Sequence, residues 1–192
     1  MDKIRYLVLI VLSLSTSTIQ AAGLGFSLSM AYDLGGDELA KVVDKDGDSI
    51  STVRANEGIT FGAGFVLPVS RNLGLQSSIG YKSYSEEAAN GDEISWKSFP
   101  WETSIIARLG QFELGGGVIY HLSPEYKLDV GRSSENIDFD NALGYQAQAA
   151  YLVKTSVGDG LALGLRYTSI DLEKNRLTLN GDSVGFFVKF YL

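Results

Sequence analysis

The feature that most constrains this chain is a hydrophobic alternation with a period of two residues, which returns eight times. In the first segment, Leu24, Phe26 and Leu28 are large and apolar, while the residues between them are glycine or serine. Such alternation indicates a β-strand with one apolar face and one small or polar face. The pattern occupies residues 24–32, 59–67, 73–81, 99–109, 112–122, 143–153, 161–167 and 184–192.

The connectors between these segments alternate in length. Those at 68–72, 110–111 and 154–160 are short, whereas those at about 34–55, 85–97, 123–141 and 171–182 are long and polar. Transmembrane barrels have short periplasmic turns and longer external loops. The sequence therefore predicts an all-β protein, an eight-stranded antiparallel up-and-down transmembrane β-barrel with both chain ends on the periplasmic side. A soluble lipocalin-like barrel or a β-sandwich is the competing architecture, since it also alternates but places its large apolar residues inside.

The start of the chain has the pattern of a secretory signal peptide. Lys3 and Arg5 precede a short apolar run at 6–12, which is followed by a polar stretch and then by Ala21 and Ala22. This run is much shorter than the ~20 residues that a spanning helix needs. We therefore expect residues 1–21 to be a signal peptide and residues 22–192 to form the outer-membrane β-barrel domain. Export favours the membrane barrel, as do the aromatic residues near the strand ends.

One hairpin can be predicted residue by residue. If Gly110-Gln111 is a two-residue turn, Leu109 faces Phe112 and Arg108 faces Glu113. The narrow interior of an eight-stranded barrel is filled by side chains, so its charges must pair with one another. The predicted interior charge network consists of Lys82, Glu102, Arg108, Glu113, His121, Arg166 and Lys189. A narrow ion path lined by the same charges is the functional alternative.

Two stretches add a family resemblance to this pattern. They are Gly164-Leu-Arg166-Tyr167 in the seventh segment and the alternating end of the chain at 184–192. With the eight segments, they make the chain similar to the small outer-membrane β-barrel family of Gram-negative bacteria, the group that contains OmpX and the OmpA transmembrane domain. The resemblance implies a location in the cell outer membrane and insertion by the barrel-assembly machinery. Its members include adhesins, complement-evasion factors, lipid-modifying enzymes and proteins without an assigned role.

Charge is distributed unevenly along the chain. The four long connectors hold 17 of the 23 acidic residues and eight of the 16 basic ones, which gives them a net charge of −9. The whole chain has a charge of −7 and no basic cluster, which argues against nucleic-acid binding. We therefore expect a monomer in contact with outer-membrane lipid and lipopolysaccharide. Its structural or surface-interaction role would involve the acidic loops and an extracellular ligand or divalent cations.

A short acidic motif resembles part of a calcium-binding loop. Asp44, Asp46 and Asp48 have the spacing of the first three oxygen ligands of an EF-hand. The match fails at Ser49, where glycine makes the turn, and at Ala55, where a bidentate glutamate is needed. A solvated loop tip is therefore preferred to a weak calcium site, and no metal or cofactor is predicted.

The only histidine raises an enzymatic alternative. His121, Ser123 and Glu135 have a spacing similar to the His-x-Ser and Glu of outer-membrane lipid A deacylases, in which histidine is the base for the serine nucleophile. Ser123 is followed by Pro124-Glu125 rather than by the Asn-Ala of that family, and alternation points His121 into the barrel. An interior hydrogen bond between His121 and Glu102 is the alternative interpretation. The absence of cysteine excludes a thiolate metal site and a cysteine nucleophile.

Overall fold

The structure is a computed structural model that describes residues 24–43, 49–87, 92–130, 133–153 and 160–192. The predicted signal peptide at 1–21 and the motif Asp44, Asp46 and Asp48 lie outside these residues. No helix in the described part of the chain is long and apolar enough to cross a bilayer.

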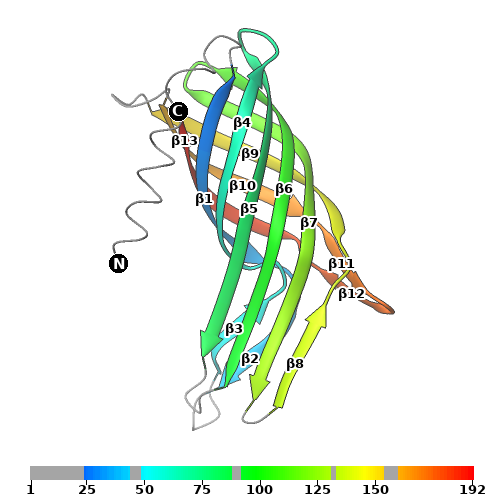
Figure 1. Cartoon of the computed structure of the whole chain (residues 1–192). Helices are drawn as coiled ribbons and strands as arrows, with labels where there is room; N and C mark the ends of the chain where they lie inside the picture. The colour runs from blue at the N-terminus through cyan, green and yellow to red at the C-terminus, as the bar shows by residue number, and fades with distance from the viewer. Residues whose placement is uncertain (1–23, 44–48, 88–91, 131–132, 154–159) are drawn as a thin grey trace, which may run out of the picture.

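Eight antiparallel strands close into a barrel, as the alternation predicts (Figure 1). Seven pairings follow the order β6-β5-β4-β1-β13-β10-β9-β7, and the pairing of β6 with β7 completes the circle. The barrel strands are β1 (Gly25–Gly35), β4 (Gly58–Pro68), β5 (Leu73–Glu87), β6 (Glu93–Leu109), β7 (Phe112–Val130), β9 (Ala142–Val153), β10 (Gly160–Ser169) and β13 (Ser183–Tyr191).

The register of the β6–β7 hairpin is the predicted one. Leu109 lies opposite Phe112 and Arg108 lies opposite Glu113 across the turn. Gly110 has a φ of 66°, a left-handed value that a two-residue hairpin turn requires at its first position. The β6–β7 pairing therefore follows from one glycine and the alternation beside it.

The barrel wall is apolar outside, and its interior holds most of the polar and charged side chains together with a few apolar ones such as Ile106 and Phe187. Phe61, Ile105 and Leu143 are 59%, 62% and 61% exposed on the outer face. Asp33 and Lys82, which alternation places on the other face, are buried. This distribution is the reverse of a soluble barrel, whose large apolar side chains fill the interior. It is the distribution expected of a barrel wall in contact with lipid.

Beyond the lipid-facing wall, the side on which the apolar residues lie changes. In β6, Trp101 points outward and is 52% exposed, whereas Ile94 and Trp96 point inward and are 7% and 1% exposed. The strand itself keeps its alternation, so only the placement of apolar residues has switched. An apolar exterior suits lipid and an apolar interior suits water, so the switch marks where β6 leaves the membrane.

A bulge in β7 lets this strand follow the same switch. Leu122 pairs with Phe99 but Glu125 pairs with Lys97, so β7 has one extra residue between these two pairs. Ser123 lies within it and has a φ of 46°, as bulge residues often do. The bulge changes the inward-facing positions from odd to even numbers, and Tyr126 thereby becomes buried.

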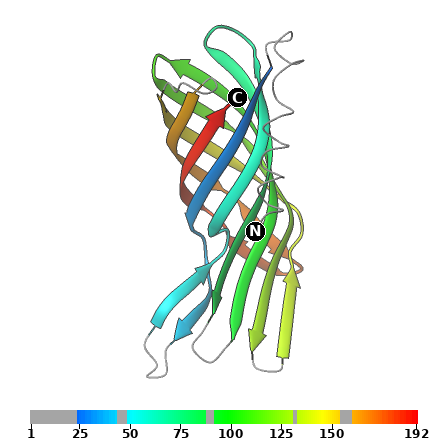
Figure 2. The same cartoon turned by 60° about the vertical axis from the view of Figure 1, so that its left-hand side comes forward.

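The four long connectors are mostly β-structure rather than irregular polar loops. β5, β6 and β7 run beyond the barrel, and the remaining strands form added hairpins or edges (Figure 2). These strands are β2 (Glu38–Val43), β3 (Ser49–Arg54), β8 (Ser133–Asp138), β11 (Asp171–Lys174) and β12 (Leu177–Asn180). These charged segments also contain a second set of apolar residues, separate from those on the outer wall of the barrel. Its buried members form the extracellular core, which consists of Val53, Ala55, Ile94, Trp96, Tyr126, Phe139, Ala142, Ile170 and Leu172.

The two tryptophans provide a test of this arrangement. In vesicles of brominated lipid, we expect strong quenching of Trp101 fluorescence in the Trp96→Phe variant, because Trp101 faces the acyl chains. We expect little quenching of Trp96 in the Trp101→Phe variant, because Trp96 is buried above the membrane. Steady-state fluorescence checks both variants, and equal quenching would contradict the switch.

Candidate functional site

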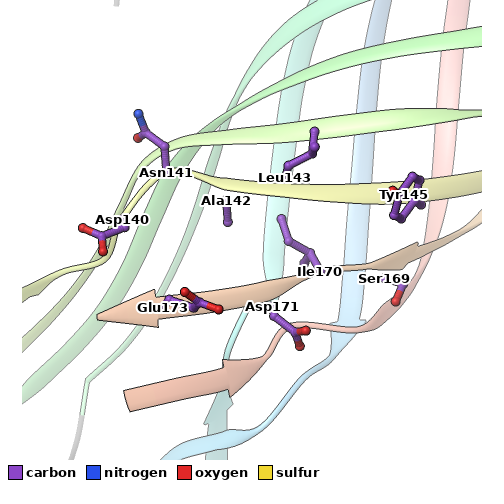
Figure 3. A pocket seen from close by; sticks show the side chains of 9 residues that line it. All are labelled: Asp140, Asn141, Ala142, Leu143, Tyr145, Ser169, Ile170, Asp171 and Glu173. Atoms are coloured by element: carbon purple, nitrogen blue, oxygen red, sulfur yellow. The ribbon is translucent and has the colours of Figure 1, made fainter. Parts of the chain in front are cut away.

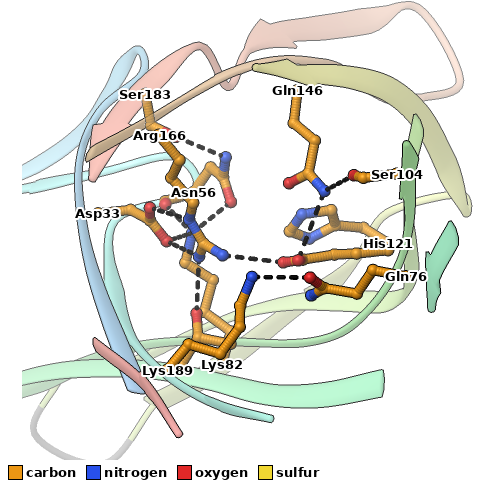
Figure 4. A network of polar contacts seen from close by, with 12 residues as sticks. Asp33, Asn56, Gln76, Lys82, Ser104, His121, Gln146, Arg166, Ser183 and Lys189 are labelled. Carbon is orange, nitrogen blue, oxygen red and sulfur yellow. Dashed lines mark hydrogen bonds and ion pairs between the residues drawn. The ribbon is translucent and has the colours of Figure 1, made fainter. Parts of the chain in front are cut away.

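The first interior cluster is built around Asp33, which lies near the end of β1 and is 1% exposed. Arg166 donates from Nε to Asp33 Oδ1 at 2.8 Å and from Nη2 to Oδ2 at 2.6 Å, which is a bidentate ion pair (Figure 4). Lys82 Nζ lies 2.9 Å from Asp33 Oδ2 and donates to Asn56 Oδ1 at 2.6 Å. One buried carboxylate therefore joins two buried cations on strands β5 and β10.

A glycine makes the central ion pair possible. Gly185 on β13 is in register with Asp33 on one side and with Arg166 on the other. A Cβ at Gly185 would overlap Asp33 Oδ1. Since there is none, the carboxylate and the guanidinium meet across β13.

Glu102 extends this network toward β9. Arg166 donates from Nη1 to Glu102 Oε1 at 2.8 Å, and Gln146 Nε2 lies 3.5 Å from Glu102 Oε2 and 2.9 Å from Ser104 Oγ. The expected hydrogen bond between His121 and Glu102 is not formed. His121 Nδ1 instead lies 3.0 Å from Ser98 Oγ, because Arg166 and Gln146 occupy the carboxylate.

A second cluster lies toward the periplasmic end and centres on Glu113. The hydroxyl of Tyr191 donates to both Glu113 oxygens, at 2.7 and 2.8 Å, and Arg108 donates at 3.2 Å, which agrees with the predicted cross-hairpin pair. Lys189 donates to Gln76 Oε1 at 2.8 Å and lies 3.9 Å from Glu113. Lys82, Glu102 and Arg166 are thus in the first cluster and Arg108, Glu113 and Lys189 in the second, whereas His121 is buried beside Ser98.

These side chains fill the described part of the lumen. A cavity beside Arg166, Glu102 and Lys189 has a volume of about 20 Å³, close to that of one water molecule. The extracellular core lies beyond the charge network, on the side away from the termini. This packing favours the salt-bridged plug over the narrow ion path.

The structure does not bring together the three residues of the hydrolase alternative. His121 is 1% exposed inside the barrel and bonds to Ser98. Ser123 is exposed at the bulge, and its backbone N–H donates to Asn141. Glu135 is exposed on β8 opposite Leu128, seven residues along β7 from His121, or roughly 23 Å at the usual rise per residue. The spacing in the sequence therefore reflects a bulge and an added strand rather than a catalytic triad.

A hollow lies on the extracellular side, between the start of β9 and β11. Its volume is about 400 Å³, and its walls include Asp140, Asp171, Glu173, Leu143 and Tyr145 (Figure 3). Within the described residues, no group of three or more acidic or histidine side chains is arranged to hold a metal ion.

Several residues that take part in the interior contacts were not in the predicted charge network. The alternation of β1 predicts Asp33 on the inward face with Ser27, although the predicted charge network omits it. Tyr191 likewise follows the alternation of β13. Asn56 lies in a turn after β3, and Gly185 contributes only by having no side chain, so neither has a signal in the sequence.

Taken together, the closed circle of eight strands, the lipid-facing wall and the filled polar lumen define a small transmembrane β-barrel of the outer-membrane class. Barrels of this class belong to the outer membrane, which agrees with the predicted localisation.

The chain is similar to several solved structures. Ail of Yersinia pestis in complex with the heparin analogue sucrose octasulfate matches with a TM-score of 0.56 and 13% identity, over 88% of this chain and 97% of Ail. A further Ail structure matches with a TM-score of 0.55 and 12% identity over the same shares. Neisserial surface protein A gives a TM-score of 0.48 and 13% identity, over 88% of this chain and 96% of that protein. No protein-family model and no curated protein sequence matches the chain.

The central carboxylate should dominate stability. We expect Asp33→Asn to lower the free energy of unfolding by about 3–5 kcal/mol, because Lys82 and Arg166 lose their shared counter-ion in a buried site. Urea unfolding of barrels refolded in vesicles measures the loss. Glu38→Gln is the control, since its exposed pair with Arg54 is worth at most ~1 kcal/mol. Equal losses in both variants would contradict the central role of Asp33.

The role of Gly185 can be separated from that of the charges. Gly185→Ala should lower the free energy of unfolding by about 1–3 kcal/mol, because the new methyl group displaces the Asp33 carboxylate. Gly25→Ala is the matched control, since a Cβ there has nothing within 4 Å. The same unfolding assay compares the two variants. A Gly185→Ala variant as stable as Gly25→Ala would show that the ion pair between Asp33 and Arg166 does not depend on the missing side chain at position 185.

Proposed function

We propose that this outer-membrane barrel is a surface-recognition protein whose binding element is the sheet β5–β8. The proposal rests on the free side of strand β8. This strand pairs with β7 on one side, and in the described part of the chain no strand pairs with its other side. The barrel is already closed without β8, so the strand is not needed for closure.

The binding element stands on a rigid base. Trp96 on β6 and Tyr126 on β7 are buried in the extracellular core, and the Trp96 ring lies 5.8 Å from that of Phe139. Rigid elements hold a binding surface better than mobile loops, because less conformational entropy is lost on binding. This packing supports a role for the protruding sheet beyond covering the barrel.

The charge of the surface supports a cationic partner. Glu135 and Asp138 are exposed on β8, next to its unpaired side. An extended partner segment can add itself to such an edge through backbone hydrogen bonds, with side chains providing specificity. Ail was solved with an anionic heparin analogue, whereas acidic side chains at this edge favour Lys or Arg in the partner.

The remaining expected partners fit the same proposal. The barrel strands are all paired on both sides, which supports a monomer in which the free side of β8 is left for the extended partner. The apolar wall supports contact with outer-membrane lipid and lipopolysaccharide, and insertion by the barrel-assembly machinery. Divalent cations at the acidic surface remain part of the proposal.

A peptide selection tests the proposed edge. We expect random peptides displayed on phage, selected on barrels in zwitterionic nanodiscs, to become enriched in extended Lys- or Arg-rich sequences. The affinity of an enriched peptide should fall about tenfold or more in the variant Glu135→Lys/Asp138→Lys, because like charges then face each other. Interferometry on the refolded variants measures the affinity.

The control moves the same charge change to another hairpin. Asp171→Lys/Glu173→Lys on β11 should leave the affinity of the peptide within about twofold, if distant surface charges are screened. Enrichment without basic residues, or an equal loss in both variants, would overturn the proposed edge.

A further inference from the structure

The hairpin β11–β12 differs from the other extracellular hairpins in its direction. It leaves the barrel wall sideways, whereas β5–β8 and β2–β3 continue well beyond the barrel (Figure 1). In the rotated view the hairpin again ends short of the tips of β7 and β8 (Figure 2). Its tip therefore lies near the level at which the barrel wall emerges from the lipid.

The base of this hairpin is firmly fixed. Leu172 is fully buried in the extracellular core, and Asp182 accepts hydrogen bonds from the Ile170 backbone N–H at 3.0 Å and from the Tyr167 hydroxyl at 2.8 Å. Asn180 is bound to Asp37 through its backbone N–H, at 2.8 Å. With this base fixed, the sideways direction is a property of the fold.

The tip of the hairpin carries cations without acidic partners. Among the extracellular cations whose side chains are described, Arg54 pairs with Glu38, Lys97 with Glu125 and Lys127 with Asp129, at 3.2, 2.9 and 2.5 Å. The hydrogen bond from Lys127 lowers the pKa of the Asp129 carboxyl below its ordinary value.

Lys174 and Arg176 differ from these three cations, because neither has an ion-pair partner within the described residues. The neighbouring acid, Glu173, lies on the opposite face of the strand from Lys174, since side chains alternate. Lys174 is the last residue of β11 and Arg176 lies in the turn that follows, so both cations are at the tip of the hairpin.

An apolar side chain accompanies these cations. Leu177 pairs with Lys174 across the hairpin and is 45% exposed. An exposed leucine beside two free cations matches an interface that is anionic at its surface and apolar just beneath. The outer surface of a membrane whose lipids carry phosphate has this composition.

We propose that the tip of β11–β12, formed by Lys174, Arg176 and Leu177, binds the phosphate groups of outer-leaflet lipopolysaccharide. Arg176 offers a planar set of N–H donors that suits phosphate oxygens, and Lys174 adds a point charge. Leu177 contacts the lipid beside the phosphates. This site differs from the β8 edge in position, in charge and in ligand, so the two proposals stand or fall separately.

The binding test compares two lipids that differ only in phosphate. Barrels in detergent micelles are titrated with bisphosphorylated lipid A or with lipid A from which the phosphates have been removed, and native mass spectrometry measures the bound fraction. The native chain should prefer the phosphorylated lipid, and Lys174→Gln/Arg176→Gln should weaken its binding about tenfold. Lys97→Gln/Lys127→Gln, which removes two paired cations, should leave the preference unchanged.

Three outcomes would overturn the proposal. They are an unchanged preference in Lys174→Gln/Arg176→Gln, an equal loss in the control variant, and full displacement of the lipid by millimolar inorganic phosphate. The last would show that the tip binds free phosphate rather than a lipid.

A second measurement locates the tip. The chain has no cysteine, so Asn175→Cys and Ser134→Cys each provide one site for a spin label. In vesicles, a nickel chelate attached to lipid headgroups should relax the label at 175 strongly and the label at 134 weakly. Equal relaxation of the two labels would contradict a membrane-level tip.

Discussion

The ion pair between Asp33 and Arg166 is the interaction on which the rest of the barrel depends. Eight strands enclose a lumen that side chains fill, so an interior charge has little water to stabilise it. Asp33 forms ion pairs with both Arg166 and Lys82, and Arg166 forms a further ion pair with Glu102. The lumen is stable because its charges stabilise one another, and the same pairing leaves little room for conduction.

One continuous set of strands passes through two solvents, the lipid of the membrane and the water outside it. Within the membrane, apolar side chains face outward and the polar set is enclosed. Above it, Trp96 and Tyr126 turn the apolar set inward, and the chain becomes an ordinary water-exposed β-structure with a core. The bulge at Ser123 shifts the inward-facing positions of β7 by one residue, so that its apolar side chains face inward where those of β6 do. The extracellular part is therefore a folded extension of the barrel.

The barrel could be predicted from the sequence because lipid imposes a strict two-residue alternation on every strand. The pairing of Arg108 with Glu113 followed from one glycine turn and needed no tertiary information. The extracellular strands were missed because their acidic residues suggested irregular loops, although Ile94 and Trp96 keep the alternation on the other face. The partner of His121 could not be predicted, because only the assembled lumen brings Arg166 and Gln146 to Glu102 and Ser98 to His121.

The glycine at position 185 also makes the central ion pair sensitive to the alignment of the last strand. Asp33 and Arg166 lie 133 residues apart in the chain and meet only where β13 presents no side chain between them. A slip of β13 by two residues keeps the same face inward but brings Ser183 or Phe187 to that position. The buried charges would then be separated, and the free-energy cost of burying them unpaired would destabilise the misaligned barrel. The ion pair thus selects one register of β13 between β1 and β10, because it can form only in that register.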